Sequence, residues 1–468
     1  MISSETLTEK KRKQVDTKKT IRDMTSGSPM RLILGFAVPM LLGILFQQLY
    51  SMVDTVMVGR FLGADALAAV GSTGAINFMV NGFVIGATAG FAIPVAQRFG
   101  ARDFDGMRQY VGNIVWLTIL FSAVMTACMS VLAHQVLVWM HTPDEILEQA
   151  YSYIVIIFMG LSATYLYNIT ASIVRSLGDS KSPVYFLMIS SVLNIILDYV
   201  TIRILGMGVR GPALATIISQ LVSGVLCFFY MVRRFDILTL KQDDLRMRAE
   251  CVQRLLWMAI PMGLQYSITS IGNIILQTAV NTLGVISVAA VTAGDRIIVL
   301  FACVFDSLGG TMATYQGQNR GALKYDRLKA GAASAMKIGA VYSVIAVAVL
   351  ATIGWKLPLL FVTNGNAEVV AGAHQYLMTQ VLFFIPLCAV NVFRFSIQGM
   401  GFSGIAIIAG ICEMFGRGLA GFLGVRYFGY TAACLAAPLA WLFADAFLIP
   451  CFYRCVRKLG KEETNSMS

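Results

Sequence analysis

Twelve long apolar runs recur along the whole chain, and they constrain the fold more than any other feature. A helix of ~20 apolar residues crosses the ~30 Å hydrocarbon core of a bilayer. Lipid offers the backbone no hydrogen-bond partner, so only helices or closed barrels span it, and a barrel would show short alternating segments instead. We predict an all-α membrane protein with transmembrane helices at about 31–58, 66–95, 110–133, 147–174, 184–205, 212–233, 254–280, 286–314, 332–355, 374–397, 404–425 and 431–453.

Charge confirms the membrane setting and predicts an orientation. Only 13% of the residues are charged, about half the share of a soluble protein. With the N-terminus inside, 28 of the 36 lysine and arginine residues fall on the cytoplasmic side. This bias follows the positive-inside rule. We therefore expect both termini in the cytoplasm and a multi-pass protein of the inner cell membrane. The net charge of +11 reflects this topology, and no basic stripe interleaved with aromatic residues indicates nucleic-acid binding.

The chain repeats itself at an offset of about 222 residues. Val38-Pro39-Met40 matches Ile260-Pro261-Met262, and Asn168 matches Asn391. Each half holds an even number of spans, so the halves have the same orientation and form a parallel repeat about the membrane normal. We predict a basic cytosolic tail without fixed structure, a six-helix bundle, a cytosolic linker, a second six-helix bundle and a cytosolic tail, over residues 1–28, 29–233, 234–253, 254–455 and 456–468.

Duplicated bundles suit alternating access, in which one bundle moves against the other around a central cavity. This favours a transporter over an enzyme, and no H-E-x-x-H or G-x-S-x-G motif is present. The chain also lacks a G-x-x-x-x-G-K-[ST] phosphate loop, so ATP is disfavoured as the direct energy source. We expect no cofactor, and an ion gradient is the remaining common source of energy.

Polar residues inside the first bundle are the candidate coupling site. Asp54 lies late in the first span, Asn194 and Asp198 share one face of the fifth, and Thr216 begins the sixth. Carboxylate, amide and hydroxyl oxygens suit a hard cation such as sodium, and two neighbouring carboxylates also favour proton binding. Residue types alone do not separate these two ions. The alternative is that Asn194 and Asp198 only join helices by hydrogen bonds, but two acids within one bundle are costly for packing alone.

The stretch Val53–Val70 resembles the first signature of the multidrug and toxic compound extrusion (MATE) family, as do Gln316–Ala322 and Arg175–Asp179. The resemblance covers about residues 30–455. It implies export of small organic substrates, cationic or amphiphilic, in exchange for sodium ions or protons. We also expect a monomer, with no metal beyond a sodium ion at Asp54 and Asp198.

The resemblance assigns roles to individual residues. The family's cation site has an acid on the first helix, an Asn-x-x-x-Asp pair on the fifth and a threonine on the sixth. Asp54, Asn194, Asp198 and Thr216 match this pattern. Pro39 resembles the first-helix proline at which that helix bends. Gln47 and Tyr153 occupy positions that resemble others near the pocket of the first bundle. Asn168 is a polar residue that we also expect to line this pocket.

One departure indicates a subgroup. NorM-like members carry a glutamate on the seventh helix, whereas residues 261–270 contain no acid, so the chain looks closer to the DinF-like pattern. In the second bundle Glu413 and Arg417 are four residues apart, and we predict a structural or gating ion pair. The roles of Asp306, Arg394 and Asp445, and the identity of the substrate, stay open.

A lipid or lipid-linked saccharide flippase is the alternative function. It would need cationic residues in the central cleft, and Arg296, Arg394 and Arg417 are the candidates.

Overall fold

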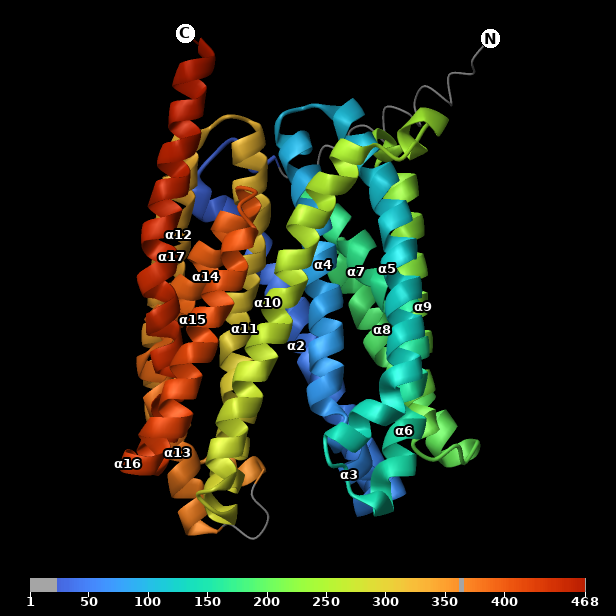
Figure 1. The fold of residues 1–468 in the computed structure, drawn as a ribbon, viewed down its shortest axis with the longest axis vertical. Coiled ribbons are helices and arrows are strands. Elements are labelled where there is room, and N and C mark those ends of the chain that lie inside the picture. The colour runs from blue at the N-terminus through green and yellow to red at the C-terminus, as the bar shows by residue number, and fades with distance from the viewer. Residues whose placement is uncertain (1–22, 362–365, 468) are drawn as a thin grey trace. The chain divides into compact units, whose positions relative to one another are not determined.

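The computed structural model describes residues 23–361 and 366–467, and its regular elements within these ranges are all helical. The predicted basic tail lies for the most part outside the described residues. Figure 1 shows the helices of the first half running side by side. These helices are α2 (Pro29–Leu62), α3 (Ala64–Ser72), α4 (Gly74–Gly100), α5 (Phe104–Trp139), α6 (Asp144–Met159), α7 (Leu161–Ser176), α8 (Ser182–Tyr199), η1 (Val200–Ile204) and α9 (Arg210–Arg234).

The second half follows two short turns, η2 (Asp236–Leu238) and η3 (Gln242–Leu245), in the linker between the halves. Its helices are α10 (Ala249–Asn281), α11 (Val285–Gly321), α12 (Tyr325–Ile353), η4 (Leu357–Leu360), α13 (Ala367–Leu382), α14 (Phe384–Gly399), α15 (Gly404–Leu419), η6 (Ala420–Gly424), α16 (Val425–Phe428) and α17 (Tyr430–Met467).

Among the described residues, nine helices are long and apolar enough to cross a membrane, or eleven if each bent pair counts as one span. The bent pairs are α6 with α7, at 45°, and α13 with α14, at 52°. They correspond to the predicted spans 147–174 and 374–397. The twelfth long helix is α10, whose 33 residues include Gln265, Ser270, Asn273 and Gln277. These polar side chains interrupt the apolar sequence of α10, which is not among the helices counted above.

Gly160 stands at the bend between α6 and α7. A Cβ atom at this position would lie 2.2 Å from the side chain of Ile217 on α9. Glycine therefore allows α9 to pass close to the bend. Helix α6, the first part of this span, packs on α3, and helix α7, the second part, packs on α4. The bend thus gives the two parts of one span different neighbours.

The chain divides into two compact units, and the division does not follow the linker. Of the described residues, unit 1 comprises 23–26 and 42–263, and unit 2 comprises 27–41, 264–361 and 366–467. Helices α2 and α10 therefore each begin in one unit and end in the other. Both changes occur two residues after a proline inside the helix, Pro39 in α2 and Pro261 in α10.

The linker lies against α5 within unit 1. The Asn113 side chain accepts a hydrogen bond from the backbone N–H of Arg248 at 3.0 Å, and the Trp116 indole donates to the carbonyl of Leu245 at 2.8 Å. A Cβ atom on Gly112 would lie 2.0 Å from the carbonyl oxygen of Asp244. The linker backbone is therefore fixed on α5 and makes direct contact with it.

Candidate functional site

Three helices of unit 1 bring the predicted coupling residues together. Asp54 comes from α2, Asn194 and Asp198 from one face of α8, and Thr216 from α9. We refer to these four residues as the acid cluster. The Asn194 amide donates to the Thr216 hydroxyl oxygen at 3.5 Å. The carboxyl groups of Asp54 and Asp198 are neighbours and interact electrostatically.

The acid cluster is withdrawn from solvent. The Asp198 side chain is 0% exposed and Asn194 is 2% exposed, while Asp54 is half-buried. Four oxygen atoms of the cluster have no hydrogen-bond partner among the described residues: Asp54 Oδ1, Asn194 Oδ1 and both carboxylate oxygens of Asp198. A buried acceptor without a partner is costly, and a buried carboxylate is more so. The cluster therefore presents acceptors that a cation or a proton would satisfy.

Two tyrosines flank the acid cluster. Tyr153 on α6 is buried, and the charges of Asp54 and Asp198 both act on its hydroxyl. Tyr50 on α2 lies one helical turn before Asp54, is subject to the same two charges, and shares a hydrogen bond with the Gln47 side chain. Gln47, Tyr50 and Asp54 thus occupy one face of α2. Sequence reasoning missed Tyr50, although its spacing of four residues from Asp54 was the available signal.

Among the described residues, neither Asn168 nor Pro39 has a hydrogen bond to the acid cluster. Asn168 donates its amide hydrogen to the carbonyl of Thr164, 2.9 Å away on its own helix. Pro39 precedes Asp54 by fifteen positions on α2, a distance of about 22 Å along a helix. Pro39 also belongs to unit 2, whereas Asp54 belongs to unit 1.

The second half contains a separate buried ion cluster. Glu413 on α15 accepts from Arg417, with 3.4 Å between the charged atoms, and also forms an ion pair with Arg394 of α14. All three side chains are buried. Asp445 on α17 is also buried and lies within the electrostatic reach of Arg394. Two arginines and two acids give this buried set a balanced charge, which is what the low dielectric of a membrane protein requires.

The pairing of Glu413 with Arg417 is therefore present, and its structural or gating role stays a prediction. Arg394 is the partner that helical spacing did not reveal, because it comes from a different helix. Asp306 is exposed on α11 and interacts electrostatically with Arg394. Among the described residues, no group of three or more histidine, cysteine, aspartate or glutamate side chains is placed to hold a metal ion.

Comparison with known proteins places these features in context. The MatE family model matches residues 39–200 and 261–419. A probable multidrug resistance protein of Bacillus subtilis, YoeA, is 28% identical over 375 residues, which cover 78% of this chain and 80% of YoeA. The FAD transporter of Shewanella oneidensis is 24% identical over 435 residues, covering 91% of this chain and 94% of that protein.

Solved structures share the fold. The outward-facing conformation of a multidrug resistance MATE family transporter of the MOP superfamily matches with a TM-score of 0.88 at 23% identity. The match covers 95% of this chain and 99% of that one. Together with the long apolar helices, it confirms the predicted class, an all-α membrane protein with two six-helix halves. The DinF-like assignment stays a prediction.

Proposed function

The chain belongs to the MatE family, and we propose that it exports small organic molecules in exchange for protons or sodium ions bound at the acid cluster. The observation that carries this proposal is the set of four buried oxygen atoms without hydrogen-bond partners among the described residues. Such an arrangement is costly unless a positive charge completes it. Hard cations bind oxygen ligands, and a proton would be shared between the two carboxyl groups.

Coupling requires that the ion and the substrate favour different conformations, since a ligand shifts an equilibrium only through its differential affinity. Helix α2 is suited to transmit this preference. It carries Asp54 and Tyr50 in unit 1, and its first part, with Pro39, belongs to unit 2. A proline leaves the carbonyl one turn earlier without its helical hydrogen bond, so α2 bends most easily there. Ion binding at Asp54 would change the bend and release the substrate outward.

The substrate class is proposed from the relatives. Multidrug resistance proteins and an FAD transporter are among them, so the panel to be tested must include both cationic dyes and a flavin nucleotide. As an exporter, we propose, the protein lies in the inner cell membrane with both termini in the cytoplasm. We propose a monomer that uses no cofactor other than the coupling ion.

The test is transport by the purified protein in proteoliposomes, with sodium and pH gradients imposed separately. Asp54→Asn and Asp198→Asn remove a charge from the cluster and preserve side-chain shape. We expect gradient-driven efflux to fall by ~10-fold or more, corresponding to a loss of at least ~1.4 kcal/mol of coupling. Asp65→Asn is the matched control, because Asp65 is an exposed acid at the start of α3 in the same unit.

Wild-type efflux by both cluster variants would refute the acid cluster as the coupling site. The gradient that drives the wild-type protein identifies the ion. Of the three arginines that the flippase alternative needs, Arg394 and Arg417 are buried and paired with Glu413, and Arg296 is exposed on α11. The charges of Arg394 and Arg417 are compensated, which weakens these two as ligands for a pyrophosphate.

A further inference from the structure

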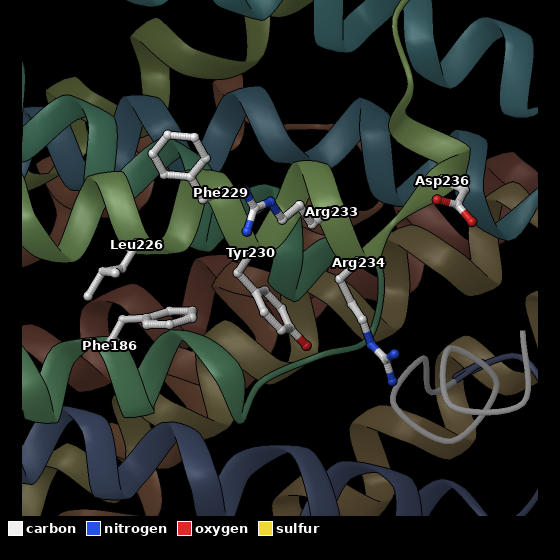
Figure 2. A pocket seen from close by; sticks show the side chains of 7 residues that line it. All are labelled: Phe186, Leu226, Phe229, Tyr230, Arg233, Arg234 and Asp236. Carbon is white, nitrogen blue, oxygen red and sulfur yellow. The ribbon is translucent and has the colours of Figure 1, made fainter. Parts of the chain in front are cut away.

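A pocket lies at the arginine-rich end of α9, outside the acid cluster and unrelated to its chemistry (Figure 2). Its volume is about 390 Å³, and it is formed by α8, α9 and the first residues of the linker. Its walls are apolar and aromatic, and its remaining lining is charged. The lining residues are Phe186, Leu226, Phe229, Tyr230, Arg233, Arg234 and Asp236.

The aromatic wall of this pocket is fixed in place. The Tyr230 hydroxyl donates to Asp179 Oδ2 at 2.9 Å and accepts from the Ser182 hydroxyl at 2.8 Å. The ring of Phe186 packs on the Tyr230 ring with 5.5 Å between centroids. Because these contacts hold Tyr230 and Phe186 in place, the wall does not have to be ordered when a ligand binds.

The charged part of the pocket favours an anion. The Arg233 guanidinium lies over the Phe229 ring, 5.9 Å from its centroid, and Arg234 follows it directly. Asp236 is the one acid in the lining, so the lining carries a net positive charge. Figure 2 shows the Asp236 carboxylate to one side of the aromatic wall, away from Arg233. Figure 2 shows the two guanidinium groups on different sides of Tyr230, so an anionic group at this end of the pocket would be attracted by the charge of both arginines without being held between them.

The apolar wall opens toward the lipid-facing side of the helices. Leu226 is 37% exposed and Phe229 is 53% exposed. On α8, beyond Phe186 toward the middle of the helix, Ile189 and Val192 are exposed as well. An apolar track thus continues from the pocket along the helices into the hydrocarbon layer. A soluble anion would use the arginines but would leave this track uncovered.

We infer that this pocket binds an anionic phospholipid, with the headgroup at the end of the pocket that carries Arg233 and Arg234 and an acyl chain along Phe229, Leu226 and Ile189. A basic pocket between membrane helices at the cytosolic surface is suited to an anionic headgroup. The end of α9 that carries the arginines is the end that the positive charge bias places on the cytosolic side. The inference is independent of the coupling ion and of the transported substrate.

The experiment measures lipid binding directly, by native mass spectrometry of the full-length protein titrated with phosphatidylglycerol or phosphatidylcholine. We expect Arg233→Gln/Arg234→Gln to weaken phosphatidylglycerol binding by about 10- to 30-fold, the loss of roughly two surface cations near a phosphate. Lys241→Gln/Arg246→Gln is the matched control. It removes the same charge from exposed positions in the linker that line no apolar wall, and it should bind phosphatidylglycerol as the wild type does.

A second pair of variants separates recognition from folding. Arg233→Lys/Arg234→Lys keeps both charges and should retain most of the binding, and Leu226→Gln should weaken it while leaving the arginines intact. Equal binding by the arginine variant and the wild type would overturn the inference. So would equal losses in the arginine and linker variants, or displacement of the lipid by millimolar inorganic phosphate. The last result would assign the pocket to a soluble phosphate compound instead.

Discussion

At the scale of single residues, the two halves use buried charge in different ways. In the first half, Asp198 is fully buried and its charged neighbour is a second acid, Asp54, and among the described residues no ion pair joins either acid to a basic side chain. In the second half, the buried acid Glu413 is paired with two arginines. The first arrangement is incomplete without a cation or a proton, and the second is already compensated. This difference is our reason for proposing a coupling site in one half and a structural ion cluster in the other.

Glu413→Gln tests the structural role. It leaves Arg394 and Arg417 buried without their shared counter-charge, and breaking a buried pair in this way costs about 3–5 kcal/mol. We expect a clearly lower thermal unfolding midpoint for the purified protein. Glu148→Gln, which alters an exposed glutamate on α6, should leave the midpoint unchanged. A wild-type midpoint combined with lost transport would instead favour gating.

At the scale of elements, the helix that carries Asp198 ends in a π-helical turn. The turn η1 begins at Val200, and a second one, η6, begins at Ala420 in the other half. These starting points are 220 positions apart, close to the offset of the sequence repeat. Single π-helical turns often mark functional sites. The second half has the same turn, but α15 carries Met414 and Gly418 at the positions that match Asn194 and Asp198. The turn is therefore a property of the repeated fold and does not depend on the residues of the acid cluster.

The docking of the linker on α5 is an element-scale property that Gly112→Ala tests. The added methyl group would meet the Asp244 carbonyl, which belongs to the backbone and cannot rotate away. We expect the linker to be displaced at a cost of about 1–3 kcal/mol, so that trypsin cleaves at Lys241 and Arg246 faster than in the wild type. Gly74→Ala is the control, since a Cβ atom there meets nothing within 4 Å. Unchanged cleavage of the Gly112 variant would show that the docked state is not maintained in solution.

At the scale of the whole molecule, the halves of the sequence are not the halves of the structure. The first part of α10 packs in unit 1, where a Cβ atom on Gly90 of α4 would lie 2.7 Å from the Ala259 Cα atom. The first part of α2 packs in unit 2, where Met40 lies against Gly310 of α11. Each unit therefore requires a helical segment from the other half of the chain.

Because each half of the chain contributes one helical segment to the other unit, we can predict how the protein behaves when it is expressed as two fragments. We expect fragments 1–241 and 242–468, expressed together, to assemble into a transporter with measurable efflux. Expressed separately, each fragment should be degraded, because fragment 1–241 lacks the α10 segment of unit 1 and fragment 242–468 lacks the α2 segment of unit 2. The amount of membrane-inserted fragment after expression alone and together is the measurement. Stable accumulation of either fragment alone would show that the exchanged segment is dispensable.

The sequence by itself determined the membrane setting, the number of long helices, the repeat and the polar residues of the acid cluster. These properties depend on local composition and on spacing of three or four residues, which a single helix expresses. Helical spacing also predicted the proximity of Glu413 to Arg417.

Only the tertiary structure decided which helices share a site. Arg394 reaches Glu413 from another helix, Tyr50 and Tyr153 flank the acid cluster from α2 and α6, and the linker lies on α5. The sequence also did not predict that the first parts of α2 and α10 pack in the unit formed by the other half of the chain. The physical reason is that lipid-facing and protein-facing surfaces of these helices are both apolar, so packing partners are set by close contact between side chains and not by hydrophobic pattern.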